Sequence, residues 1–214
     1  MISMLVGIGT LGWLVGYLGA VWVGFRHKTY GVPLLAVAFN FSYEIVLAWF
    51  FLVEKVSFFR TMFAAWAIVD LGVMLTILLY AHHDKTLNLK RWQVYLIVLP
   101  SFVIFGLFHW WCASIYGPKD AAFYPAYVEN ILMSFLFIGL AIRRHGSYGQ
   151  SFILAWGKFI GTAGMTVLYG IIFGRSYALI CGSFVFVLDI VYLYFMYRGP
   201  WCARAGHTES EQHQ

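Results

Sequence analysis

Seven apolar segments, each long enough to cross a bilayer as a helix, constrain this chain more than any other feature. They cover residues 4–25, 32–53, 57–80, 94–115, 122–141, 151–173 and 177–197. About 20 apolar residues in a helix span the roughly 30 Å hydrocarbon core of a bilayer. Because lipid offers no hydrogen bonds to the backbone, such segments must satisfy their own polar groups as helices. The pattern predicts an all-α fold, a polytopic bundle of seven transmembrane helices.

The composition excludes a soluble globular protein. Of the 214 residues, 62% are hydrophobic and 11% are charged, whereas soluble domains average about 45 to 50% and about 25%. The net charge of +5 comes from Lys and Arg at the ends of the apolar segments, where they meet lipid head groups. This placement argues against a nucleic-acid partner. Three cysteines, Cys112, Cys181 and Cys202, show no metal-ligand spacing, so we expect reduced thiols.

The loops are too short to hold a separate domain. We predict a single transmembrane domain over residues 1–198 and a short polar tail over residues 199–214. The first apolar segment begins at once, without a basic region before it, so we expect no removable signal peptide. Gly12 and Gly16 form a G-x-x-x-G pattern, for which we expect close packing inside the bundle, with dimerisation as the alternative.

The buried polar residues are the second informative feature. Six ionisable side chains fall inside the apolar segments: Glu44, Asp70, His109, Glu129, Lys158 and Asp189. An ionised carboxylate near mid-membrane is costly, so such an acid is protonated, paired or turned toward a polar cavity. Glu44 lies near the middle of its segment, with Asn40 one helical turn earlier on the same face and Tyr43 beside it. The sequence leaves the roles of Asp70 and Glu129 open.

Glu44 and Asp189 are the candidate catalytic residues, because both lie near the centres of their helices, where a packing role is hardest to justify. We predict that Lys158 pairs with one of the buried acids and has a mainly structural role. His109 suits an interfacial or core position as well as a catalytic one. The candidate supporting or substrate-binding residues are Asn40, Tyr43, Asp70, His109, Asn130, Lys158 and Tyr192.

Aromatic residues surround this polar set. They are Phe39, Phe41, Tyr43, Trp49, Phe50, Trp66, Phe105, Phe108, Tyr169, Phe184, Phe186 and Tyr192. Any single ring is expected to face lipid or fill the bundle. Together, rings near a neutral carboxylic acid make a cavity where a proton can be delivered and a cation stabilised by aromatic faces.

Five parts of the chain form a recognisable pattern in this order: Asn40 to Val46 (NFSYEIV), Asp70 to Met74 (DLGVM), His109, the region from Ser147-Tyr148 to Lys158-Phe159-Ile160-Gly161, and Asp189. Together they resemble a family of small seven-helix integral-membrane terpene cyclases. This family includes the cyclases of fungal meroterpenoid and indole diterpene pathways, of the pyripyropene and paxilline types. Its bacterial relatives act on prenylated indole alkaloids.

The resemblance implies a cofactor-free and metal-independent reaction. It matches the family's essential acids to Glu44 and Asp189, which would protonate an epoxide or terminal alkene of a farnesyl or geranylgeranyl chain. The chain then closes into rings through carbocations. The implied partners are a hydrophobic prenylated substrate, the lipid bilayer and a pathway prenyltransferase. The sequence departs from the family pattern at Asp70, where Asn is common, and at Lys158, where Arg is common.

Two other hypotheses fit the same residues. A seven-helix proton-coupled transporter or receptor would use the intramembrane acids as a relay. A scaffold would use them only to hold helices together. A retinal protein would need a Schiff-base lysine on its last helix, where this chain has Asp189 instead.

The loop charges predict the orientation in the membrane. Nine Lys and Arg residues follow the first, third, fifth and last segments: Arg26, Lys28, Lys85, Lys90, Arg91, Arg143, Arg144, Arg198 and Arg204. The opposite loops hold four: Lys55, Arg60, Lys119 and Arg175. By the positive-inside rule the C-terminus is cytoplasmic and the N-terminus lies outside or in a lumen.

A reporter fused after Gln214 tests this orientation. We expect a cytoplasmic signal, because basic loops are retained on the cytoplasmic side. A compartment-specific reporter, such as an enzyme active on only one side of the membrane, gives the measurement, and the same reporter before Met1 should read the opposite side. A C-terminal signal from the outer or lumenal side, in a folded protein, would contradict the prediction.

Overall fold

The computed structural model describes the backbone of residues 1–210 and the side chains of residues 1–198. Its helices are α1 (Ile2–His27), α2 (Leu34–Val53), α3 (Ser57–Tyr80), α4 (Arg91–Tyr116), α5 (Pro118–Arg143), α6 (Phe152–Thr166) and α7 (Ser176–Ser210). A short 3-10 helix, η1 (Ala81–His83), follows α3, and a π-helix, η2 (Val167–Ile172), continues α6. Seven of these helical spans are long and apolar enough to cross a membrane. The predicted all-α, seven-helix fold is confirmed.

The helix ends agree with the predicted segments to within a few residues, except at the C-terminus. There α7 continues as a helix to Ser210, beyond the predicted end at residue 197. The side chains of Cys202 and Arg204 lie outside the described residues, as does the last part of the predicted tail, residues 211–214. Cys112 and Cys181 are free thiols, as expected.

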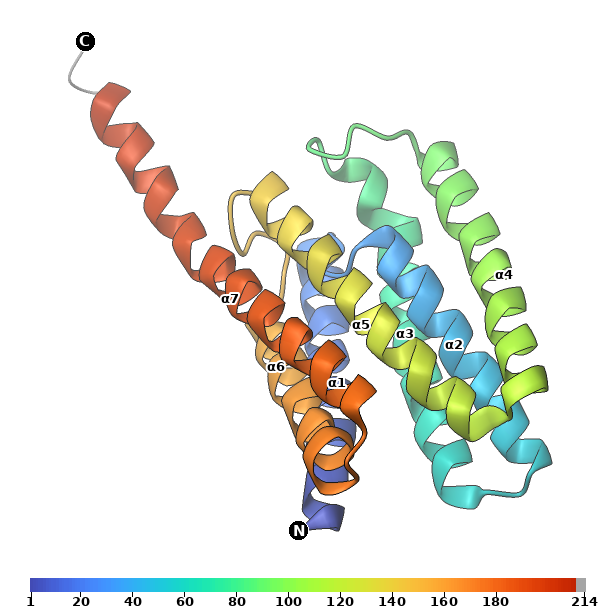
Figure 1. Cartoon of the computed structure of the whole chain (residues 1–214). Helices are drawn as coiled ribbons and strands as arrows, with labels where there is room; N and C mark the ends of the chain where they lie inside the picture. Colours follow the sequence, from blue (N-terminus) through green and yellow to red (C-terminus); the bar gives the residue numbers. More distant parts are fainter. Residues whose placement is uncertain (211–214) are drawn as a thin grey trace.

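The helices form two groups that meet along α5 (Figure 1). In one group, α1 packs along α6 and α6 packs against α7. In the other, α2 packs between α3 and α4. Helix α5 contacts α7 on one side and α2 and α4 on the other, while α1 also contacts α3. The space between the two groups is therefore enclosed by α1, α2, α3, α5 and α6.

Small residues bring α1 and α6 unusually close. A Cβ atom added to Gly12 would lie 2.9 Å from the carbonyl oxygen of Gly157 and 3.1 Å from the Cα of Gly161. One added to Gly16 would lie 3.3 Å from the Cα of Leu154. Within the described chain, the G-x-x-x-G pattern therefore serves close packing inside the bundle, because larger residues would force these two backbones apart.

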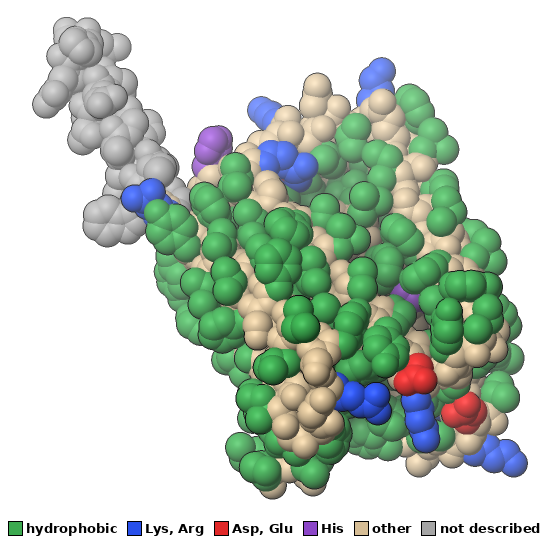
Figure 2. Space-filling model, viewed as in Figure 1, with side chains coloured by type: hydrophobic (Ala, Val, Ile, Leu, Met, Phe, Trp, Pro, Cys, Tyr) green, Lys and Arg blue, Asp and Glu red, His purple; other side chains and the backbone are tan. Residues whose placement is uncertain are grey.

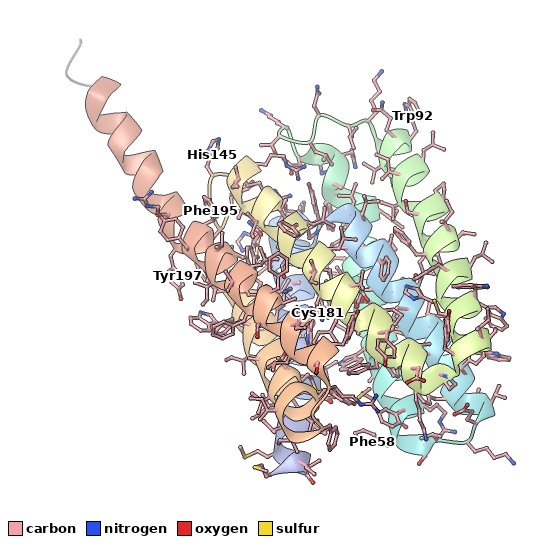
Figure 3. The ribbon with its side chains drawn as sticks, viewed as in Figure 1. Phe58, Trp92, His145, Cys181, Phe195 and Tyr197 are labelled. Carbon is pink, nitrogen blue, oxygen red and sulfur yellow. The ribbon has the colours of Figure 1, made fainter. Side chains whose placement is uncertain are left out.

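The outer surface suits a lipid environment. Apolar side chains cover most of the visible face, and charged side chains gather toward its two ends (Figure 2). Trp92 lies at one end of the bundle and Phe58 at the other (Figure 3), and each is more than half exposed, at 57% and 56%. Exposed rings at the ends of apolar helices are typical of the two membrane interfaces.

A polar cluster joins three loops at the end of the bundle that carries Arg143 and Arg144. Arg144 donates to Asp84 Oδ2 through Nε at 3.0 Å and through NH2 at 2.9 Å. Tyr30, which is fully buried, donates its hydroxyl to the same oxygen at 2.9 Å, and its carbonyl oxygen accepts from Arg144 at 2.7 Å. Burial raises the pKa of Asp84, but hydrogen bonds from Thr86 and Arg144 outweigh it and lower that pKa from 3.8 to about 2.

This cluster predicts a pH-dependent contribution to stability. Since the folded-state pKa of Asp84 lies below its unfolded value of 3.8, the contribution is present above about pH 4 and is lost as the pH falls toward 2. Asp84→Asn should destabilise the detergent-solubilised protein by about 1 to 2 kcal/mol at neutral pH, because charge-assisted hydrogen bonds are lost. Thermal melting over a pH series from neutral down to about pH 2 measures this.

The matched control is Glu54→Gln, since Glu54 is an exposed acid at the C-cap of α2 with no hydrogen bond from a side chain among the described residues. The wild type and this control should lose stability between pH 4 and pH 2, while Asp84→Asn should lose less. An identical acid dependence in Asp84→Asn and wild type would show that the cluster contributes no pH-dependent stability.

Candidate active site

A cavity of about 340 Å³ lies between the two helix groups. Its walls come from α1, α2, α3, α5, α6 and η2, and most of the larger side chains are aromatic. They are Trp13, Tyr17, Tyr43, Phe51, Phe59, Phe63, Trp66, Phe123, Tyr127 and Tyr169. Cavities of this size that are mainly apolar, with a few convergent polar groups, are typical binding sites for small molecules.

The cavity opens at the end of the bundle where α5 and α7 begin. Lys119, Asp120 and Arg175 line it there and are exposed. The Arg175 guanidinium lies 6.0 Å from the centre of the Phe123 ring, which also lines the cavity. Acidic and basic side chains gather at the lower end of the face shown in Figure 2, where the α4–α5 and α6–α7 connections lie in Figure 1.

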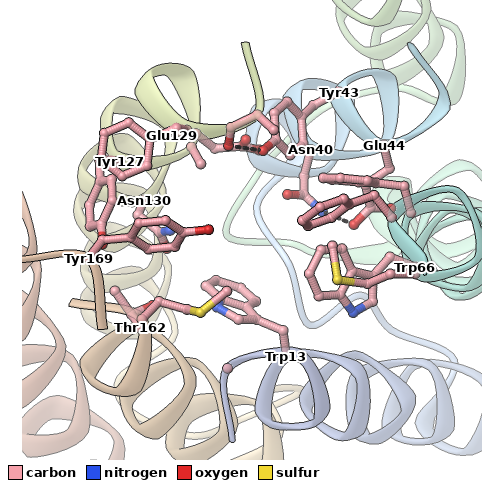
Figure 4. A pocket seen from close by; sticks show the side chains of 18 of the residues that line it. Trp13, Asn40, Tyr43, Glu44, Trp66, Tyr127, Glu129, Asn130, Thr162 and Tyr169 are labelled. Carbon is pink, nitrogen blue, oxygen red and sulfur yellow. Dashed lines mark hydrogen bonds between the residues drawn. The ribbon is translucent and has the colours of Figure 1, made fainter. Parts of the chain in front are cut away.

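Glu44 and Asn40 form one polar part of the wall, which we call the acid wall. Both residues line the cavity, and Glu44 is only 2% exposed. Asn40 Nδ2 donates to Glu44 Oε1 at 2.9 Å (Figure 4). It also donates to Asp70 Oδ2 at 2.7 Å. One turn of helix separates Asn40 from Glu44, so α2 places both on the face that meets the cavity.

Asp70 lies behind the acid wall rather than on it. It is fully buried on α3 and does not line the cavity. The second oxygens, Glu44 Oε2 and Asp70 Oδ1, have no hydrogen-bond partner among the described residues. The structure therefore brings the predicted residues Asn40, Glu44 and Asp70 together, with one carboxamide bridging two carboxyl groups.

Tyr43 lines the cavity next to the acid wall, and His109 supports it from behind. The Tyr43 hydroxyl donates to the carbonyl oxygen of Ala122 at 2.5 Å. The His109 ring packs edge-on against Tyr43, with centroids 5.3 Å apart, and against Phe39 at 4.6 Å. His109 is 2% exposed and does not line the cavity. Its position fits a core residue that fixes the Tyr43 ring.

Asp189 and Lys158 form a buried ion pair outside the cavity. Lys158 Nζ lies 2.5 Å from Asp189 Oδ1, and both side chains are at most 1% exposed. Ser134 Oγ accepts from Lys158 at 2.7 Å and lies 2.8 Å from both Asp189 Oδ1 and the Asn130 carbonyl oxygen. Lys158 thus has an acidic partner, as the sequence led us to expect.

The structure does not bring Asp189 to the cavity with Glu44. Asp189 touches the site only through neighbours: Lys158 Nζ lies 5.7 Å from the centre of the Trp13 ring, which lines the cavity, and Ser134 contacts the backbone of Asn130. The rotation of α7 about its own axis decides whether Asp189 faces the cavity. The spacing of residues along the sequence does not reveal that rotation. The catalytic role of Asp189 stays a prediction.

The remaining predicted residues divide between the cavity and the core. Asn130 lines the cavity. Tyr192 does not: its hydroxyl donates to Gln150 Oε1 at 2.9 Å, and its ring packs 5.2 Å from Phe137. Tyr192 therefore joins the start of α6 to α7 rather than contacting a ligand.

The cavity has a second polar region, which we call the polar wall and which the sequence predicted only in part: Asn130 was a candidate, the role of Glu129 was left open, and Thr162 was not named. The polar wall consists of Glu129, Asn130, Thr162 and Tyr169, from α5, α6 and η2. The available signal was the Glu129-Asn130 pair near the middle of an apolar segment. Tyr169 was expected only as one of the surrounding rings, and its place on this wall depends on the π-helix. Among the described residues, no three His, Cys, Asp or Glu side chains gather where they could hold a metal ion.

Comparisons with known proteins agree with this architecture. Residues 1–199 match the family model of the Pyr4-like transmembrane terpene cyclases. The terpene cyclase cle7 of Aspergillus versicolor is 25% identical over 161 residues, which are 74% of this chain and 66% of the relative. The terpene cyclase ascF of Acremonium egyptiacum is 27% identical over 169 residues, 72% of this chain and 61% of the relative. The terpene cyclase paxB of Penicillium paxilli is 26% identical over 158 residues, which are 73% of this chain and 64% of the relative.

These alignments span less than two thirds of the length of each of the three relatives. No solved structure matches the chain. The family model, in contrast, covers every transmembrane helix and all residues of the cavity. This chain therefore belongs to the family of Pyr4-like transmembrane terpene cyclases.

Proposed function

We propose that this protein is a membrane-bound terpene cyclase that closes the prenyl chain of a meroterpenoid or prenylated indole alkaloid into rings. The observation that carries the proposal is a buried carboxyl group, Glu44, held by Asn40 on the wall of an aromatic cavity. Family membership supports the same class of reaction. No observation on the cavity favours a carrier or a scaffold instead.

The cavity suits a hydrophobic chain. Its walls are mainly rings and aliphatic side chains, so a farnesyl or geranylgeranyl group gains free energy by leaving water for it. The charged opening at Lys119, Asp120 and Arg175 lies at the membrane interface, where a substrate with a polar head would arrive. A prenyltransferase is the class of enzyme that must supply such a substrate.

Glu44 is the proposed proton donor. Its O–H bond breaks as the proton moves to the terminal alkene of the chain, or to the oxygen of a terminal epoxide. The resulting cation is attacked by the next alkene, which forms a ring and passes the charge onward. Loss of a proton from a carbon beside the last cation returns that proton to a base, so the net reaction is an isomerisation. It consumes neither an oxidant nor a reductant.

Asn40 makes this transfer easier. Protonating an alkene demands a strong acid, and a hydrogen bond to the carboxylate left behind favours the transfer. Asn40 Nδ2 already donates to Glu44 Oε1 at 2.9 Å before any reaction. Asp70 accepts the other hydrogen of the same amide at 2.7 Å, and so fixes the Asn40 side chain in that orientation.

The rings of the cavity have two roles in the proposal. The faces of Trp13, Tyr43 and Trp66 can stabilise a cation as it moves along the chain, since aromatic faces attract positive charge. Filling the cavity with substrate also excludes water, which would otherwise quench the cation early.

For Asp189, we propose a supporting role in place of proton donation. The Lys158–Asp189 pair lies behind Trp13 and Asn130, and it holds α6, α7 and Ser134 of α5 in place. A buried charge that loses its partner is strongly destabilising. Loss of Asp189 should therefore disturb folding or the shape of the cavity before it affects proton transfer.

The first activity test compares Glu44→Gln with Asp70→Asn. Both amides keep the shape of the acid and can still accept from Asn40, but only Glu44→Gln removes the proposed proton donor. We expect Glu44→Gln to lower turnover per folded molecule by at least about 10² to 10⁴, the usual contribution of a general acid. Asp70→Asn should stay within about tenfold of wild type, because it alters the support of Asn40 alone.

Turnover is measured by product analysis on a farnesylated or geranylgeranylated aromatic substrate, with and without a terminal epoxide. Size-exclusion profiles and melting temperatures of each variant confirm the amount of folded protein. Near-normal cyclisation by Glu44→Gln would remove Glu44 from the donor role. Equal loss in both variants would assign proton transfer to the Glu44–Asp70 pair.

The second activity test concerns the ion pair. Lys158→Arg keeps the charge and should retain substantial activity, while Lys158→Met should lower expression or thermal stability, because Asp189 is left buried without its cation. Asp189→Asn should lose activity only in step with the loss of folded protein. The measurement is turnover per folded molecule beside a melting curve.

The double variant Lys158→Met with Asp189→Leu is the matched control, since it removes both charges together. It should be more stable than Lys158→Met alone. A normally folded Asp189→Asn protein without turnover would instead place Asp189 among the catalytic residues, as the family resemblance implies.

A further inference from the structure

The polar wall presents hydrogen-bonding groups that the proposed reaction does not use. Glu129 lines the cavity, is 3% exposed, and its Oε1 has no hydrogen-bond partner among the described residues. Asn130 Oδ1, on the next residue of α5, and Thr162 Oγ1, on α6, also belong to cavity-lining residues and also have no hydrogen-bond partner among the described residues. Three residues of the cavity wall, two on α5 and one on α6, thus each leave one buried polar atom unpaired among the described residues.

Buried polar atoms without a hydrogen bond raise the free energy of the folded protein. A buried polar group without a hydrogen bond destabilises a protein, and more than nine in ten buried groups in known structures have a partner. A carboxyl group near the middle of a membrane is the most expensive of them. Glu129 lies about halfway along α5, far from the loops at either end. A ligand that supplies its hydrogen bonds would remove this cost.

The π-helix brings a hydroxyl group to the same wall. Tyr169 lies within η2, and Figure 4 shows its hydroxyl pointing across the cavity toward Asn40. A π-helix shifts the helix face by inserting a residue, and such insertions are frequent at functional sites. Gly170 allows the tight packing that follows, because a Cβ there would lie 3.0 Å from the backbone of Leu179 on α7.

We propose that the polar wall is a binding subsite for a hydroxyl group on the head of the substrate, with Glu129 as its main partner. This inference rests on the proposed function, and it assigns the two polar regions of the cavity to opposite ends of one molecule. The head is bound by Glu129, Asn130 and Tyr169, and the far end of the prenyl chain reaches Glu44. The class of ligand is a prenylated phenol, enol or alcohol.

The chemistry of the wall selects a hydroxyl over other groups. A carboxyl, a carboxamide and a phenol each offer both a donor and an acceptor. A hydroxyl also does both, so it can donate to one of these side chains and accept from another. A methyl ether has no donor and would leave an acceptor of the wall unpaired, which is how buried polar sites reject analogues that lack a hydrogen bond.

The test measures binding in the Glu44→Gln background, where the substrate is expected to stay unreacted. The probes are a farnesylated phenol and its methyl ether, which differ only at the head. Equilibrium binding to the full-length protein in detergent gives the ratio of their dissociation constants. We expect the phenol to bind about tenfold or more tightly, as a buried hydrogen-bonding site requires.

Two substitutions at Glu129 and one control complete the design. Glu129→Leu should bring the ratio close to one, because it removes the main partner of the hydroxyl. Glu129→Gln should keep most of the preference, since an amide still donates and accepts. Met133→Leu is the control: it lines the same cavity one turn further along α5 but has no hydrogen-bonding role, so the ratio should not change.

Equal binding of both probes to the parent, or a preference unaffected by Glu129→Leu in folded protein, would overturn the subsite. So would a Glu129→Gln protein with wild-type Glu44 that binds both probes normally but cyclises neither, since Glu129 would then transfer a proton. Failure of the proposed function gives a different result, because the Glu44→Gln protein would then turn over substrate normally. The preference for the phenol over its methyl ether could still be measured in that case, by competition between the two probes for the wild-type protein.

Discussion

The structure depends on one constraint: polar groups inside a membrane must find partners within the protein. The buried charged side chains of this bundle differ in how far their polar atoms find partners. Lys158 and Asp189 neutralise each other at 2.5 Å. Glu44 and Asp70 share the amide of Asn40. Glu44 Oε2 and Glu129 Oε1 still have no hydrogen-bond partner among the described residues, and both of these carboxyl groups border the cavity. The Lys158–Asp189 ion pair lies behind the cavity wall, which suits a structural role. The carboxyl groups of Glu44 and Glu129 lie on the wall, which suits contact with a ligand.

The cavity exists because the first helix group is tightly packed within itself, while large side chains fill the borders of the space between the two groups. Close contact at Gly12 and Gly157 fixes α1 against α6. Large rings such as Trp13 and Trp66 then line the gap toward α2 and α3. The same rings that keep the gap from collapsing present faces suited to a cation, so the packing of the fold and the proposed chemistry use the same side chains.

Much of this protein could be predicted from its sequence. The apolar segments predicted the helices, and the position of Glu44 at the centre of the second segment marked it as a site residue. The spacing of Asn40 and Glu44 predicted one shared helix face. The helices and the shared face agree with the structure because membrane depth and helical spacing are both read directly along the chain. The role of Glu44 stays a prediction. Tyr169 was predicted only as one of many rings around the polar set, since the π-helix that turns it to the cavity breaks the regular spacing.

By itself, the sequence determined the fold class, the depth of each polar residue and the identity of the buried acids. Only the tertiary structure decided which acids face the cavity. Glu44 and Asp189 both lie near the middle of their apolar spans, yet α2 turns Glu44 to the cavity while α7 turns Asp189 to Lys158. The rotation of each helix about its axis is set by packing against its neighbours, and in a segment apolar on every side the sequence carries little information about that rotation.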